Sequence, residues 1–182
     1  MNTSFGDAAK KHSKDSFCIS VVLKEGQLGR SWSQAGTSSE FVADVLARQS
    51  AKSGLDFQET RHTIIYLVNE LLENAVKFSC AGDVEIQCSL EDDSFELAVV
   101  NHIDPELVPN FQALIAELTS RDPGELLLER IEANAADEES SASGLGILTL
   151  MNDYGVRMVW HFSNAVAGSA VVLRTQACVS FN

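Results

Sequence analysis

Hydrophobic side chains recur at three- and four-residue spacing in two long stretches of the first half of the chain, which predicts two amphipathic helices. The first is expected to begin with a serine cap near Ser38 and to end at Gly54. The second is expected to begin at Asp56, a capping residue, and to continue to about Cys80. The second stretch has the broader apolar stripe, so we expect it to be the central helix. Residues 24–37 between the first strand and the first helix are rich in turn formers and could contain a hairpin.

Other segments are rich in β-branched and aromatic residues, which predicts strands. The first spans residues 16–23. Residues 83–90 and 95–103 flank the acidic turn Glu91–Asp93, which is typical of an antiparallel pair. Two more strands are expected at residues 155–162 and 169–181, joined by a turn.

Three further helices are expected between these strand pairs. One covers residues 104–118 with Pro105 near its start, and one begins at Asp122 and ends in an acidic, serine-rich stretch. The last covers residues 144–154 and opens with glycines. The element order predicts an α+β two-layer sandwich, in which helices pack on one face of a mostly antiparallel or mixed sheet. Residues 1–15 are polar and are expected to be flexible, and residues 16–182 are expected to form one domain.

Charge and cysteine content narrow the function classes. The chain has 182 residues and a formal net charge of −13, which disfavours binding to nucleic acid and to anionic membranes. Its four cysteines form no CxxC pair, which favours thiols in a reducing compartment. The N-terminus lacks the apolar region of a signal peptide, and no apolar run is long enough to span a membrane. We therefore expect a cytoplasmic protein.

The acidic residues are unevenly distributed. Residues 122–139 contain seven acids and one base, Arg130. An anionic ligand must bind away from this segment, or the segment must move.

The predicted central helix contains the first candidate for chemistry. Glu70 and Asn74 are four residues apart and lie on one face, as do Glu73 and Lys77. An Asn amide oxygen is a hard ligand for Mg²⁺, and a nearby Glu could accept the proton of an attacking hydroxyl. Lys77 could meet a phosphate as a point charge. The same spacing is also typical of a solvated helix edge with an ordinary ion pair.

The second candidate is the stretch SASGLGILTLM, which begins at Ser141. Glycines before an apolar helix let the backbone approach a ligand, and the unpaired N–H groups of the first helical turn suit a phosphate. Ser141 and Ser143 could add hydroxyl donors. A flexible loop that ends in a capped helix would give the same pattern.

The two motifs together resemble those of the GHKL superfamily of ATPases, which includes gyrase, histidine kinases, MutL and the anti-sigma-factor serine kinases. NELLENAVKF at residues 69–78 resembles the N box, and SGLGI at residues 143–147 resembles the G2 box. The resemblance covers roughly residues 38–176 and implies a Bergerat-type ATP-binding fold, with residues of about 121–142 as the lid over the nucleotide.

The resemblance implies a role for each matched residue, with ATP and Mg²⁺ as cofactors. Glu70 would be the general base, and Asn74 would be the metal ligand. The remaining nucleotide-binding positions would be Lys77, Phe78, Asn101, Ser143, Gly144, Leu145 and Gly146.

The chain departs from the superfamily in its G1 box, which is DxGxG in the family. Asn101 stands at the aspartate position and both glycines are missing, so only an uncharged amide oxygen could accept a hydrogen bond from adenine. His62 lies on the same helix as Asn74 and is expected to be structural or exposed. A histidine kinase is also disfavoured, because the chain has no room for a phosphoacceptor hairpin.

Three functions remain open. The first is a regulatory protein that binds Mg-ATP and phosphorylates a serine or threonine of a small partner, such as a STAS-domain or sigma-factor-pathway protein. The second is a degenerate domain of the same fold that regulates a partner by docking, with weak or no nucleotide binding. The third is an unrelated α+β domain in which the motifs are coincidental. The resemblance also allows a homodimer, since kinases of this type are often dimers.

Overall fold

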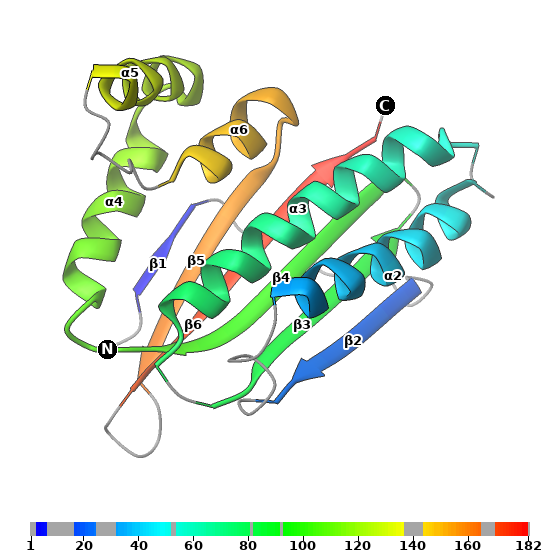
Figure 1. Ribbon diagram of the computed structural model, residues 1–182, viewed down its shortest axis with the longest axis horizontal. Coiled ribbons are helices and arrows are strands. Elements are labelled where there is room, and N and C mark those ends of the chain that lie inside the picture. The colour runs from blue at the N-terminus through cyan, green and yellow to red at the C-terminus, as the bar shows by residue number, and fades with distance from the viewer. Residues whose placement is uncertain are drawn as a thin grey trace.

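The computed structural model describes residues 3–6, 17–24, 32–51, 54–80, 82–91, 93–136, 144–164 and 170–181. Within these residues it contains six strands and five helices. The expected α+β fold is confirmed: one antiparallel sheet forms the first layer, and the helices form the second layer on one face of it (Figure 1).

The strands follow the order β1-β5-β6-β4-β3-β2 across the sheet, and each described pairing is antiparallel. The strand bounds are β1 (Thr3–Phe5), β2 (Phe17–Leu23), β3 (Val84–Glu91), β4 (Ser94–Ile103), β5 (Arg157–Asn164) and β6 (Val171–Ser180). The predicted hairpin of β3 and β4 is therefore present, with β6 completing the centre of the sheet beside β4.

The helices are α2 (Trp32–Ser50), α3 (Phe57–Phe78), α4 (Val108–Ser120), α5 (Pro123–Ala136) and α6 (Leu145–Asp153). Helices α2 and α3 run antiparallel to each other over β2, β3 and β4, whereas α4 and α6 lie over the opposite half of the sheet (Figure 1). Helix α5 packs on α6 and stands farther from the sheet.

The register of the sheet separates an apolar face from a polar one. One row across the sheet that faces the helices consists of Val21, Ile86, Val99, Thr175, Trp160 and Phe5. The next row, on the opposite face, consists of Ser20, Gln87, Ala98, Gln176 and Val159. Because side chains alternate along a strand, this two-residue period places the hydrophobic core between sheet and helices.

Helix α3 anchors the helix layer. The Asp56 carboxylate accepts a hydrogen bond from the Glu59 backbone N–H (2.8 Å), as its capping position predicted. The side chains buried along α3 are Thr60, Thr63, Ile64, Leu67, Val68, Leu71, Leu72 and Ala75. This stripe is wide enough to contact both the sheet and the neighbouring α2, so α3 holds its polar residues at fixed positions.

Three boundaries differ from the sequence predictions. Thr3–Phe5 forms the edge strand β1 against β5, although residues 1–15 were expected to be flexible. Helix α2 begins at Trp32, well before the predicted serine cap, so part of the turn-rich stretch is helical. Helix α4 begins at Val108 with Pro109 in its first turn, and Pro105 belongs to the preceding turn. The local sequence mispredicted these three boundaries, because tertiary packing determines where each of these elements begins.

Candidate functional site

The predicted N-box residue Glu70 lies directly against the glycine motif. A Cβ built on Gly146 would lie 1.7 Å from Glu70 Oε2 and 2.4 Å from its Cδ, so a larger residue at this position would displace the Glu70 carboxylate. Two segments more than seventy residues apart in the sequence are therefore in contact. Here, however, the glycine gives room to a carboxylate of the protein itself.

Burial changes the protonation chemistry of Glu70. Loss of solvent around its carboxylate, followed by the negative charge of Glu73, raises the pKa of Glu70, and a hydrogen bond with Tyr66 partly opposes the shift. The carboxylate is thereby a stronger base than an exposed glutamate, which suits the predicted role of proton acceptor.

Tyr66, which hydrogen-bonds Glu70, in turn contacts Thr149 and Tyr154. Burial and then the charge of Glu70 raise the pKa of Tyr66, against a hydrogen bond with Thr149 of α6. The Tyr66 ring stacks on Tyr154 just after α6, with centroids 5.3 Å apart. The sequence analysis did not predict any of these three residues as part of the site. Tyr66 could have been found, because it lies four residues before Glu70 and therefore on the same helix face.

Asn74 and Asn101 meet at a second place, about one helical turn farther along α3. Both line a small cavity, and Asn101 is 2% exposed. The Asn101 Nδ2 donates to the Ala75 carbonyl oxygen of α3 (3.2 Å), which ties β4 to the helix. The full lining comprises Leu71, Asn74, Ala75, Phe78, Asn101, Phe111, Ile147, Met158, Trp160, Leu173 and Thr175. The two asparagines predicted from separate motifs thus share one cavity with the G2-like helix.

This cavity is much smaller than a nucleotide. Its volume is about 20 Å³, enough for about one water molecule, and its lining is mostly apolar. Pockets for ligands of drug size have volumes of roughly 300–1,000 Å³. The amide groups therefore suit a magnesium–nucleotide complex chemically, but the space between them does not admit one in this conformation.

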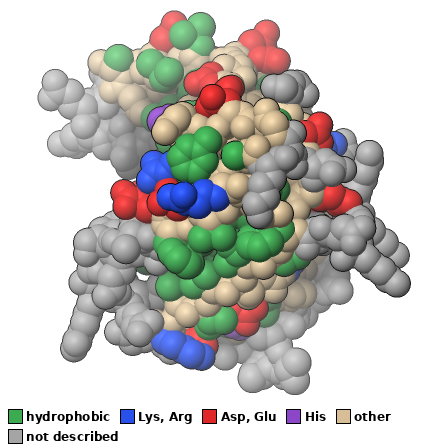
Figure 2. Space-filling model, turned by 90° about the vertical axis from the view of Figure 1, so that its right-hand side faces the viewer, with side chains coloured by type: hydrophobic (Ala, Val, Ile, Leu, Met, Phe, Trp, Pro, Cys, Tyr) green, Lys and Arg blue, Asp and Glu red, His purple; other side chains and the backbone are tan. Residues whose placement is uncertain are grey.

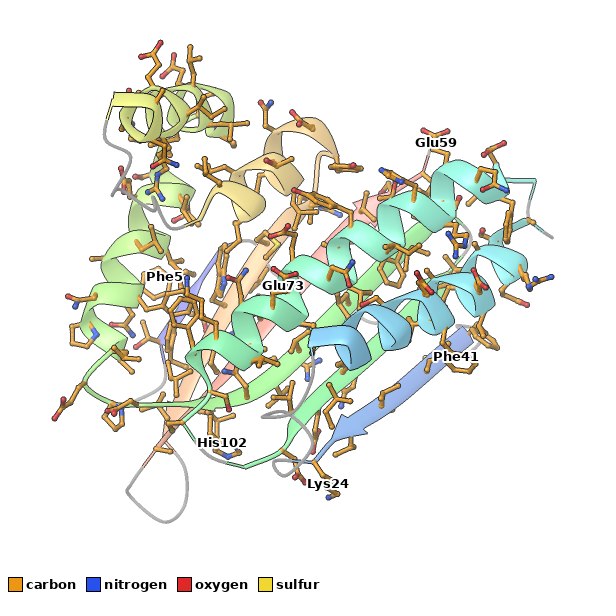
Figure 3. The ribbon with its side chains drawn as sticks, in the orientation of Figure 1. Phe5, Lys24, Phe41, Glu59, Glu73 and His102 are labelled. Carbon is orange, nitrogen blue, oxygen red and sulfur yellow. The ribbon has the colours of Figure 1, made fainter. Side chains whose placement is uncertain are left out.

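Phe111 of α4 forms one wall of this space. Its ring centroid lies 5.7 Å from that of Phe78 and 6.1 Å from that of Phe162. Phe5 of β1 continues the aromatic cluster, with its ring 6.1 Å from Phe162, and Figure 3 shows Phe5 between α4 and the sheet.

A larger groove lies on the other side of Phe78 and Phe111. It has a volume of about 230 Å³ and is lined by Phe78, Ile103, Leu107, Asn110, Phe111 and Leu114. The two rings therefore border both spaces.

The remaining predicted nucleotide-binding residues lie around the small cavity and do not line it, apart from Phe78. Lys77 is exposed, and its Nζ lies 5.3 Å from the Phe78 ring centroid, so it does not line the small cavity. Gly144 is the N-cap of α6 with φ 92°, and a Cβ there would lie 3.0 Å from Arg130 Nη1. Leu145 is half-buried in the first turn of α6.

The predicted lid is only partly described. Its residues 123–136 form helix α5, where Arg130 is mostly buried and donates to Glu117 Oε2 of α4 (3.0 Å). Ser141, Ser143 and the acidic end of the lid lie outside the described residues.

In comparisons with known proteins, the chain matches no family model and no curated protein. Among the helices of the described residues, none combines the length and apolar character needed to cross a bilayer.

Proposed function

We propose that the chain is a regulatory protein with a Bergerat-type ATP-binding fold, which binds Mg-ATP and phosphorylates a serine or threonine of a small partner protein. The observation that supports this best is the convergence of three separate motif segments. Glu70 contacts Gly146, while Asn74 and Asn101 line one cavity beside Ile147 of the same helix α6. A shared binding site would account for this meeting.

Each residue has a chemical role in this proposal. The Asn74 amide oxygen would hold Mg²⁺, and the Asn101 amide oxygen would accept a hydrogen bond from the adenine amino group. Mg-ATP, when bound, would supply the phosphoryl group. The Glu70 carboxylate would take the proton from the hydroxyl of the partner's serine or threonine. The partner would be a STAS-domain or sigma-factor-pathway protein, as the superfamily resemblance implies.

The conformation described is then a closed state. Phe111 would have to leave its place beside Phe78 so that the cavity and the neighbouring groove merge into one pocket. Because α4 rests on aromatic side chains and contributes only Ile115 and Leu118 to the fully buried core, we expect this helix to move.

Calorimetry of ATP and ADP binding, with and without Mg²⁺, tests the proposal on the wild-type chain and on Asn74→Ala. We expect magnesium-dependent binding of ATP to the wild type and loss of this binding in Asn74→Ala, while the two proteins keep the same circular dichroism spectrum.

Phosphoryl transfer tests the role of Glu70. Transfer of the phosphoryl group from labelled ATP to a partner protein should stop in Glu70→Gln, while ATP binding remains. Full transfer by Glu70→Gln would contradict its role as the base.

The second candidate function is regulation by docking without nucleotide. The 20 Å³ cavity and the missing G1 glycines favour it. In that case neither the wild type nor Asn101→Asp, which restores the superfamily's carboxylate, should bind ATP at millimolar concentration. If Asn101→Asp tightens binding, the pocket is used and this second function is disfavoured.

A further inference from the structure

A line of hydrogen-bonded side chains crosses the sheet on the face opposite the helices. Ser4 Oγ of β1 lies 2.7 Å from His161 Nδ1 of β5, and His161 Nε2 lies 3.1 Å from Gln176 Oε1 of β6. Gln176 Nε2 in turn donates to Glu96 Oε1 of β4 (3.1 Å). Ser4 is directly opposite His161 in the sheet register, and each later link joins diagonal neighbours on adjacent strands. The register therefore brings a hydroxyl, an imidazole, an amide and a carboxylate into one connected line.

The carboxylate at the end of this line sets the direction of every hydrogen bond in it. An ionised carboxylate only accepts, so Glu96 orients the Gln176 amide with its NH₂ group toward β4 and its oxygen toward His161. Because this oxygen also only accepts, the proton of the neutral imidazole lies on His161 Nε2. His161 Nδ1 is then an acceptor, and the Ser4 hydroxyl donates to it. His161 is thus held in the tautomer that can take a proton from Ser4.

This arrangement has the parts of an activated serine. A serine hydroxyl becomes a nucleophile when an adjacent base can take its proton and a third group orients that base. In the serine proteases the serine contacts Nε2 and the orienting group contacts Nδ1. The two ring nitrogens of His161 exchange these partners, and each partner keeps its role. The Ser4 side chain is exposed and the three side chains behind it are half-buried, so the sheet holds the groups that orient the nucleophile.

We propose that Ser4 is a nucleophile that hydrolyses carboxylic esters, with His161 as its general base and with Gln176 and Glu96 as positioning residues. Ser4 Oγ attacks the carbonyl carbon of the ester while its proton passes to His161 Nδ1. The bond between this carbon and the alkoxy oxygen breaks, and the alcohol leaves with the proton. Water, deprotonated by the same base, then releases the acyl group as the carboxylic acid, and Ser4 recovers its proton. An ester suits the site better than an amide, because an alkoxide is a better leaving group than an amine anion.

The site lies at one edge of the sheet and on the face away from α3, so its chemistry is independent of Glu70 and of nucleotide binding. Strand β2 forms the opposite edge, and Figure 2 shows a hydrophobic band on that side of the molecule. Ser20 of β2 is an exposed serine on the same face of the sheet as Ser4, but β3, the strand described beside it, contains no histidine. Ser20 is therefore a matched serine without a base, on the side where an apolar reagent would adsorb without specificity.

Covalent labelling of the full chain with diisopropyl fluorophosphate, located by peptide mass spectrometry, tests the nucleophile. We expect Ser4 to be labelled about a hundredfold faster than Ser20, because general-base catalysis contributes about 10²–10⁴-fold, and His161→Gln should remove this advantage. The wild type should also hydrolyse p-nitrophenyl acetate, and Ser4→Ala should lose this activity. Labelling of Ser4 no faster than of Ser20, unchanged labelling in His161→Gln, or undiminished hydrolysis by Ser4→Ala would each overturn the proposal.

An exchange of two side chains tests the positioning residues. Glu96→Gln frees the Gln176 amide to turn its NH₂ group toward His161, which favours the tautomer that cannot accept from Ser4. We expect labelling of Ser4 to slow by about tenfold or more. Addition of Gln176→Glu should restore it, because the new carboxylate at position 176 accepts both from the new amide at position 96 and from His161 Nε2. If both variants keep the wild-type circular dichroism spectrum and the double variant labels no faster than Glu96→Gln, the positioning roles are wrong.

Discussion

Helices α3 and α4, which lie over opposite halves of the sheet, are packed very differently. Over β2, β3 and β4, helices α2 and α3 bury a continuous set of side chains, namely Val42, Ala43, Leu46, Ile64, Leu67 and Val68, each at most 1% exposed. Over the other half of the sheet, α6 buries Ile147, Leu148 and Leu150. Helix α4 buries only Ile115 and Leu118, and its Phe111 rests on other rings.

The candidate site lies where these halves meet. Glu70 and Asn74 belong to the firmly packed α3, while Gly146 and Phe111 belong to the helices across from it. The candidate side chains are thus held by a firmly packed helix, and the space beside them depends on a helix with few buried contacts. This difference indicates which half would move if the site opens.

The largest expected effect comes from removing core volume in the firm half. Leu67→Ala on α3 should lower the free energy of unfolding by about 2–5 kcal/mol, because its surroundings cannot collapse into the cavity. The matched change in the other half, Leu118→Ala on α4, should cost less, because α4 can shift. Denaturant titration measures both variants, and equal losses would mean that the halves are equally rigid.

Hydrogen exchange should reveal the same difference without mutation. Amides of α3 should exchange only in global unfolding, whereas those of α4 should exchange at least about tenfold faster, which corresponds to roughly 1.4 kcal/mol. Mass spectrometry of peptides from 57–78 and 108–120 gives the comparison. Equal protection of the two helices would contradict a mobile α4.

A smaller effect is expected at the start of α3. Asp56→Ala removes the acceptor for the Glu59 N–H and should cost about 1 kcal/mol. Asp104 accepts from the Glu106 N–H in the turn before α4, so Asp104→Ala is the matched control and should cost less. Thermal unfolding of both variants checks the order, and a larger loss for Asp104→Ala would reverse it.

The smallest effect concerns Glu70 and pH. Its folded-state pKa is raised, so the folded protein holds this proton more tightly than the unfolded chain does. Its contribution to stability is therefore present below the ordinary glutamate pKa and is lost as pH rises through the raised value. Glu70→Gln should remove this part of the pH dependence and stabilise the protein slightly at neutral pH, as thermal unfolding across pH would show. The exposed Glu40→Gln is the control, and a Glu70→Gln profile identical to the wild type would refute the linkage.

Periodicity predicted most elements because the buried stripes of α3 and the strands are strong local signals. It could not predict β1, since three residues gain their structure from pairing with β5. For the site, the motifs predicted that Glu70 and Gly146 belong together. They could not predict the Thr149 and Tyr154 contacts, or that Phe111 borders the cavity, because these depend on how α4 and α6 dock.

The most direct test of the account is the affinity for Mg-ATP of Phe111→Ala compared with the wild type, measured by calorimetry. If α4 closes a usable nucleotide site, removal of this ring should join the small cavity to the groove and tighten binding, and addition of Asn74→Ala should abolish the gain. If Phe111→Ala folds normally and binds no more tightly than the wild type, the ring does not close a nucleotide site and the account is wrong.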